Sequence, residues 1–190
     1  AQKAQHYVRQ WEQKEAQRKQ RGETSAAMAP TICFSRKIGV GALEIAEVLA
    51  QKTGQRVADR LILDKIATDA ELGQKTVTFF DERHPGKMSE LGAFLFGEKS
   101  FTMSDYLRKL FSAVMTLADT EPTIFVGRGT HLILPRDRVL AVRLISSKEY
   151  RIQRVAAILG VSESDARKEL DAADKEQRRF FQKAFGKKDA

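Results

Sequence analysis

The sequence predicts an α/β protein in which helices cover both faces of a parallel sheet. Short runs of apolar and β-branched residues alternate with longer segments in which apolar residues recur at the helical period. Unbroken apolar runs are typical of parallel strands, because helices bury both faces of such a sheet. We expect the first run to be central and none to lie at an edge; the runs are Thr31–Phe34, Thr123–Val126 and Val139–Ile145.

The size and composition of the chain predict one domain with short appendages. Its 190 residues, 42% of them hydrophobic, are enough to bury one sizeable core. The single cysteine, Cys33, lies inside an apolar run, so we expect a buried thiol and no disulfide framework. No apolar run approaches the ~20 residues of a membrane helix, and the charged N-terminal stretch lacks a signal-peptide pattern. We therefore expect a cytoplasmic protein with no membrane partner.

The first 30 residues differ in composition from the rest of the chain. Residues 1–21 are rich in Gln, Lys and Arg and predict a basic helix, and residues 22–30 form a linker of small residues. We expect the main domain to span residues 31–190. The helix has only a small apolar patch, which we expect to dock on a partner such as a second copy of the chain; its residues are Tyr7, Val8 and Trp11.

The chain is basic, with a net charge of +8, and the excess lies in residues 1–21 and 143–190. Basic ends of this kind suit phosphate-bearing ligands, whether small or polymeric. Nucleic-acid binding is the weakest hypothesis, because the charged segments contain no interleaved aromatic residues and no named binding motif.

A glycine-bearing loop follows the first predicted strand, and we expect the functional site to form around it. Gly39 and Gly41 lie between that strand and a helical pattern that ends at Gly54. A strand, a glycine-bearing loop and a helix N-terminus together form the layout of a phosphate-binding loop. The full motif has a lysine and then a serine or threonine after its second glycine, and here Ala42 and Leu43 stand at those positions.

Apolar periodicity and capping patterns predict the remaining elements. Leu43 and Leu61, each near the start of a predicted helix, are expected on its buried side. Residues 73–100 are mixed in character and predict helix fragments and loops. We expect a strand at Gln55–Val57, a helix at Leu61–Ala70, and a helix at Asp105–Leu117 that is capped by Ser104. A capping box of Ser146 and Glu149 opens a further helix that runs to Leu159. A second box, of Ser162 and Asp165, opens the last helix, which runs toward Phe185.

Two groups of charged residues are candidates for binding an anion. Arg128 directly follows a predicted strand, and ligands of open α/β sheets bind at the carboxyl ends of strands. An ion pair between Arg128 and an acidic neighbour is the alternative. On the last helix, a row of charged residues shares one face and forms either a solvated ion-pair ladder or a lid whose arginines close over phosphate oxygens. The row consists of Arg167, Asp171, Asp174 and Arg178.

Several segments, taken in order, resemble the cytidylate kinase-like family of P-loop nucleoside monophosphate kinases. They are FSRKIGVGALEIA, VADRLIL, IFVGRGTHLILP, SSKEYRIQRV and DAADKEQRRFF. The resemblance covers the chain from about Thr31 to Gly186 and leaves the N-terminal helix outside.

The resemblance implies a three-layer, Rossmann-like P-loop kinase fold with a helical lid. It also implies ATP with Mg2+ as cofactor and a nucleoside monophosphate such as CMP as acceptor. The residues that would hold the ATP phosphates are Ser35, Arg36, Lys37, Ile38, Gly39, Val40, Gly41, Ala42 and Arg167. Those that would lie toward the acceptor nucleotide are Asp59, Arg60, Arg128 and Asp174. The catalytic cations would be Arg36, Lys37, Arg128 and Arg178, and no residue is assigned to a metal.

Three departures from the family pattern bear on catalysis. Ala42 replaces the lysine of cytidylate kinases, Leu43 stands where kinase-like members commonly have arginine, and Gly129 stands where cytidylate kinases have aspartate. Arg36 or Lys37, at the other end of the loop, would then supply the missing charge. Two hypotheses remain: an active nucleotide kinase, favoured by the retained arginines, and a non-catalytic nucleotide-binding sensor or assembly module, favoured by the missing lysine.

Overall fold

The structure is a computed structural model that describes residues 28–72, 75 and 105–186, with isolated positions 13, 17 and 20 in the N-terminal segment. Most of the predicted basic helix and linker, the mixed segment and the predicted cap at Ser104 lie outside the described residues. Within the described ranges, no helix combines the length and the apolar character that crossing a bilayer requires.

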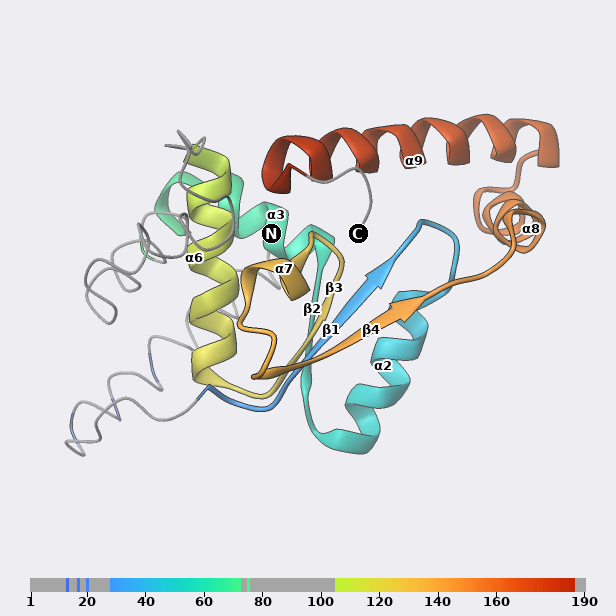
Figure 1. The fold of residues 1–190 in the computed structure, drawn as a ribbon. Helices are drawn as coiled ribbons and strands as arrows, with labels where there is room; N and C mark the ends of the chain where they lie inside the picture. The colour runs from blue at the N-terminus through green and yellow to red at the C-terminus, as the bar shows by residue number, and fades with distance from the viewer. Residues whose placement is uncertain are drawn as a thin grey trace.

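The described chain forms a four-stranded sheet in which every strand is parallel to its neighbours, in the order β2-β3-β1-β4 (Figure 1). β1 therefore lies between two strands, as the sequence predicts. The expectation that none of the three apolar runs lies at an edge is wrong for β4. Among the described strands it pairs with β1 alone, and Leu140 is 61% exposed. The strands are β1 Thr31–Arg36, β2 Arg56–Asp59, β3 Thr123–Val126 and β4 Val139–Leu144.

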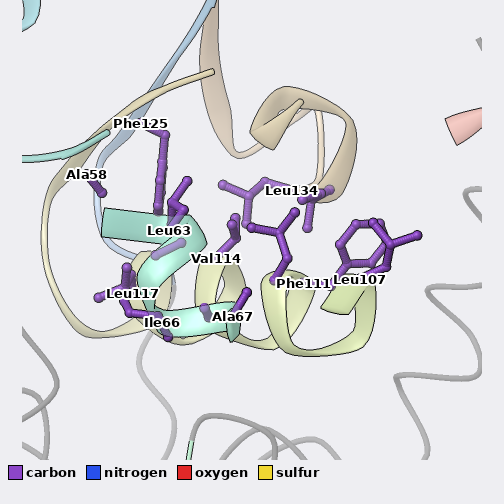
Figure 2. Close-up of a cluster of buried hydrophobic side chains, with 14 of the residues drawn as sticks. Ala58, Leu63, Ile66, Ala67, Leu107, Phe111, Val114, Leu117, Phe125 and Leu134 are labelled. Atoms are coloured by element: carbon purple, nitrogen blue, oxygen red, sulfur yellow. The ribbon is translucent and has the colours of Figure 1, made fainter. Parts of the chain in front are cut away.

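Side chains alternate between the two faces of the sheet, and each face has its own apolar core. Cys33 and Phe125 belong to the larger core, which also contains side chains of α3, α6 and α7 (Figure 2). Phe34, Ile124 and Val126 belong to the core on the opposite face, where α2 packs. Burial raises the pKa of the Cys33 thiol to about 11, as expected for a cysteine inside an apolar strand. The predicted helices on both faces are therefore confirmed.

The helices agree with their predicted positions to within a few residues. Gly54 ends α2 and Ser162 caps α9, as predicted, whereas α8 is capped by Ser147 and not by Ser146. Sequence analysis missed α7, a single turn after β3, because four residues are too few for a periodic pattern. The helices are α2 Ala42–Thr53, α3 Arg60–Thr68, α6 Asp105–Thr120, α7 Thr130–Ile133, α8 Lys148–Leu159 and α9 Glu163–Phe185.

Three local predictions are corrected by the structure. The strand expected at Gln55–Val57 extends from Arg56 to Asp59, and the next helix begins directly after it. Leu43 and Leu61 are 38% and 74% exposed, so neither lies on the buried side of its helix. Both stand in the first turn of a helix, where the neighbouring residues Ala42 and Ile62 are the ones that enter the core.

The last helix, α9, crosses the carboxyl ends of β1 and β4, the position expected of a helical lid (Figure 1). Its final turn is part of the larger core, where Phe185 stacks on Phe111 of α6 with ring centroids 5.8 Å apart. Its first half packs against α8 through Ala166 and Leu170. The helix is therefore fixed at both ends and spans the edge of the sheet at which ligands of α/β proteins bind.

Candidate functional site

The loop between β1 and α2 has the backbone geometry of an anion-binding turn. Gly39 and Gly41 adopt φ values of 85° and 79°, in the left-handed region that favours glycine. A Cβ atom on Gly39 would lie 3.1–3.2 Å from atoms of Arg151 and Val155, so a side chain has little room there. The loop also carries the backbone N–H groups from Ile38 to Gly41. These donors, beside the N-terminus of α2, are suited to bind an anion.

A cleft of about 670 Å³ opens beside this loop. Its walls come from the end of β1 and the loop, from the end of β4 and the residues that follow, and from one face of α9. We call it the edge cleft, since it lies at the carboxyl edge of the sheet. Its lining includes Ser35, Val40, Leu144, Ile145, Ser146, Gln177 and Phe181, the cations Arg36, Lys37, Arg143, Lys148, Arg151, Lys175 and Arg178, and the carboxylates Asp171 and Asp174.

Two of the cations in the edge cleft are neutralised by the two carboxylates. Lys148 pairs with Asp171 at 2.7 Å. Arg151 donates to both carboxylate oxygens of Asp174, at 2.6 and 3.1 Å, and its Nε donates to the carbonyl oxygen of Ile38 at 2.7 Å. The buried Arg151–Asp174 pair thus joins α8, α9 and the glycine-bearing loop.

The other five cations of the edge cleft have no acidic partner among the described residues. Four of them, Lys37, Arg143, Lys175 and Arg178, are exposed to solvent in the cleft. The fifth, Arg36, is half-buried at the end of β1. Burial, followed by the charges of Arg60 and Arg128, lowers the pKa of Arg36, and the charge of Asp59 only partly opposes this shift.

Arg36 also faces a second, smaller cavity of about 30 Å³, which lies where β3 ends. Arg36, Arg60 and Arg128 all line it, so we call it the triple-arginine cavity. Phe180 and Phe181 of α9 form part of its wall, and the Phe180 ring lies 4.6 Å from the guanidinium carbon of Arg128. Glu176 also lines the cavity and pairs with Arg60 at 3.3 Å. An anion in this space would chiefly offset the charge of Arg36.

Arg128 is held by an acidic neighbour, which was the alternative left open from the sequence. Its Nε donates to Asp64 Oδ1 at 2.6 Å, and a second guanidinium nitrogen donates to Asp64 Oδ2. Tyr106 also donates to Asp64, at 2.7 Å. Burial alone would raise the pKa of Asp64, but the hydrogen bonds from Arg128 and Tyr106 and the charges of Arg128 and Arg60 hold it below its ordinary value. The remaining predicted acceptor-side residues are also engaged: Arg60 contacts Asp64 and Glu176, and Asp59 caps α3.

Gly129 is required by the packing of α9. It adopts φ 68°, and a Cβ atom at this position would lie 2.5 and 2.7 Å from ring atoms of Phe185. Any side chain here would displace the aromatic end of α9. The aspartate that cytidylate kinases carry at this position therefore has no space in this chain.

The structure brings together most, but not all, of the residues predicted for the site. Asp174 is buried against Arg151, and Arg167 lies outside the residues that line either cavity. The predicted residues that line the edge cleft are Ser35, Arg36, Lys37, Val40, Asp174 and Arg178. Those that line the triple-arginine cavity are Arg36, Ile38, Arg60 and Arg128.

Sequence analysis missed several residues of the edge cleft, including Arg143, Lys148, Arg151 and Lys175. Arg143 had a detectable signal, because it is the only charge within the apolar run that forms β4. The other three lie on helices, where a cation is too common to indicate a site without the tertiary structure.

The edge cleft does not offer the ligands that Mg2+ ordinarily finds in a phosphate-binding loop. Leu43 stands at the hydroxyl position, and Asp171 and Asp174 each accept hydrogen bonds from a cation. Within the described residues, no group of three or more His, Cys, Asp or Glu side chains is placed to hold a metal ion.

The parallel sheet, the loop after its central strand and the helix over the strand ends define an α/β protein of kinase-like fold. The sequence model of the cytidylate kinase-like family matches residues 31–189, so the chain belongs to the cytidylate kinase-like family. Among solved structures, an uncharacterized protein from Eubacterium ventriosum is similar, with a TM-score of 0.62 and 20% sequence identity over 84% of this chain and 81% of that chain. This likeness concerns the fold alone. No curated protein matches the sequence.

Proposed function

We propose that the chain binds a nucleotide whose phosphates lie in the edge cleft against the loop after β1. The membership of the cytidylate kinase-like family supports a nucleotide as the ligand. The volume of the cleft, about 670 Å³, is in the range of small-molecule sites. Leu144, Ile145 and Phe181 provide apolar surface in the cleft for a base or a sugar.

The observation that carries this proposal is the position of Arg36. A half-buried guanidinium that lies near two others and has no acidic partner among the described residues is unfavourable in the free protein. A protein can keep an arginine that destabilises its ligand-free form where a bound anion offsets this loss of stability. Arg36 borders both the edge cleft and the triple-arginine cavity, so phosphate groups in either space would contact it.

We further propose that the chain transfers the γ-phosphoryl group of ATP to a nucleoside monophosphate such as CMP. The triphosphate would occupy the edge cleft, and the phosphate of the monophosphate would approach Arg60 and Arg128. Positive charge on both sides of the transferred group would stabilise the negative charge of the transition state. A cytoplasmic location remains part of the proposal.

A nucleotide-binding role without catalysis is the second candidate, and the residues after Gly41 favour it. Ala42 and Leu43 provide neither the cation nor the hydroxyl of the complete motif. Ala42→Lys separates the two candidates: if the site is a kinase site short of one cation, the added lysine should raise phosphoryl transfer or ATP affinity. A loop that has lost the kinase geometry would show neither gain, as measured by coupled assay and calorimetry.

The binding proposal is tested by Arg36→Met, with Arg138→Met as the matched control. Arg138 is 56% exposed beside Asp137, at the opposite end of β4. Calorimetry with ATP, CMP, dCMP, UMP and AMP should show at least one ligand that binds the wild-type chain and loses about one to two decades of affinity in Arg36→Met. Arg138→Met should bind as wild type. Equal affinities in all three proteins would refute the assignment.

A further inference from the structure

We infer that the edge cleft binds a nucleoside triphosphate free of magnesium, because its own lysines and arginines supply the positive charge that Mg2+ supplies in a complete phosphate-binding loop. This inference rests on the proposed function, since it concerns the form in which the nucleotide enters the same cleft. It differs from what the family resemblance implies, which is ATP with Mg2+.

The first step concerns the carboxylates at the strand ends. Mg2+ bound with a nucleotide is usually held by one or two carboxylates in addition to the phosphates. β1, β3 and β4 end in Arg36, Val126 and Leu144, none of which is acidic. β2 ends in Asp59, whose carboxylate accepts the backbone N–H of Ile62 at 2.9 Å as the cap of α3. Asp59 is not among the residues that line the edge cleft, so none of the four strand ends presents a carboxylate to it.

The second step concerns the two carboxylates that do line the cleft. Asp171 accepts from Lys148 at 2.7 Å, and Asp174 accepts from Arg151 at 2.6 and 3.1 Å. A metal ion that recruited Asp174 would leave the buried guanidinium of Arg151 without its partner, which is strongly unfavourable. Ser35 and Ser146 offer only neutral hydroxyl oxygens, which do not by themselves make a Mg2+ site.

The third step is the charge of the cleft. Once the two carboxylates have each neutralised one cation, five cations remain without an acidic partner among the described lining residues: Arg36, Lys37, Arg143, Lys175 and Arg178. Such a lining favours the most negative form of a triphosphate. Mg2+ bound to the phosphates removes a double charge, so it weakens the attraction and competes with the same cations for phosphate oxygens.

The primary experiment measures ATP binding by calorimetry, once in EDTA and once in saturating MgCl2 at equal ionic strength. We expect binding in EDTA, and roughly three- to tenfold weaker binding in MgCl2. Binding that requires Mg2+, or that Mg2+ strengthens, would overturn the inference and leave the proposed function standing. Absence of ATP binding under both conditions would overturn the inference, and absence of binding of CMP, dCMP, UMP and AMP as well would overturn the proposed function.

Two variants sharpen the result. Arg178→Gln removes one unpaired cation, and it should reduce ATP affinity more in EDTA than in MgCl2. Asp171→Asn removes a negative charge from the cleft wall and frees Lys148, so it should strengthen ATP binding both in EDTA and in MgCl2. A loss of affinity in MgCl2 alone would identify Asp171 as a metal ligand and overturn the inference. Electron paramagnetic resonance of Mn2+ with ATP gives a direct second readout, because protein-bound ATP should retain no more Mn2+ than free ATP.

Discussion

The edge cleft and the triple-arginine cavity are neighbouring spaces that hold positive charge in opposite ways. In the cavity, Arg128 is neutralised by Asp64 within the chain, and Arg60 contacts the same carboxylate. In the cleft, most cations have no acidic partner among the described residues, and they surround a volume more than twenty times larger, about 670 against 30 Å³. Among the described cations, only Arg36 borders both spaces.

This difference indicates which charged side chains stabilise the fold and which are available to bind a ligand. An arginine whose hydrogen bonds end on a protein carboxylate contributes to stability, and its loss leaves a charge uncompensated. An arginine crowded by like charges detracts from stability until an anion binds. Substitutions at the two kinds of position should therefore change the free energy of unfolding in opposite directions.

The largest effect is expected at the one buried pair of the cleft. Arg151→Met should destabilise the chain by about 3–5 kcal/mol, because Asp174 would remain buried without a cation. Arg154→Met is the matched control on the same helix; its partner Glu44 is 58% exposed, and it should cost less than about 1 kcal/mol. Urea unfolding measures both, and the double variant Arg151→Met with Asp174→Leu should recover most of the loss. Similar losses of stability in Arg151→Met and Arg154→Met would contradict the proposed difference between the buried and the exposed ion pair.

The next effect concerns the aromatic end of α9, which packs in the larger core. Gly129→Ala should destabilise the chain by about 2–4 kcal/mol, since the new Cβ would meet Phe185 and the residue keeps a positive φ. Gly186→Ala is a control with a similar φ of 64° but no atom within 4 Å, so it isolates the backbone cost of about 1–2 kcal/mol. If the two variants lost equal stability, Phe185 would not be packed as described.

The sequence predicts the sheet well because its evidence is local. An unbroken apolar run such as Thr123–Val126 indicates a buried strand, and the glycines after β1 indicate the loop. The edge position of β4 was not predictable in the same way. An apolar run does not state how many neighbours the strand has, and only the lone charge of Arg143 within it hinted at exposure.

The site was predicted less completely, because ion pairing depends on distant parts of the chain. Arg128 was identified from its place after a strand, but its partner Asp64 lies 64 residues earlier, on α3. The row on α9 was predicted to share one face, as an ion-pair ladder or as a lid. Asp174 and Arg178 both line the cleft, but Asp174 is paired with the buried Arg151, whereas Arg178 has no acidic partner among the described residues. Helical spacing places residues on one face but does not determine what that face contacts.

A smaller, pH-dependent effect on stability tests the arginines that are paired with a protein carboxylate. Asp64→Asn should cost about 2 kcal/mol at neutral pH, because Arg128 would lose its counter-ion. The pKa of Asp64 is lowered in the folded protein, so its contribution is complete above the ordinary pKa and is lost as the pH falls through the lowered value. The gap between wild type and variant should therefore shrink in acid.

Urea unfolding at a series of pH values measures this gap. Glu176→Gln, which affects an exposed pair with Arg60, should change stability by less than about 1 kcal/mol at every pH. A gap between wild type and Asp64→Asn that stays constant down to strongly acidic pH would show that the Asp64 charge does not stabilise the fold.

The smallest effect has the opposite sign and belongs to Arg36. Burial and the charges of Arg60 and Arg128 disfavour its guanidinium, so Arg36→Met should stabilise the ligand-free protein by about 0.5–1 kcal/mol. The hydrogen bond from Gln177 to the Arg36 carbonyl oxygen, 2.8 Å long, uses the backbone and should survive the substitution. Inorganic phosphate or ATP should stabilise the wild type more than the variant in thermal unfolding, so that sufficient ligand reverses their order. A variant that is less stable than wild type without ligand would place Arg36 with Arg128, among the cations that hold the fold together.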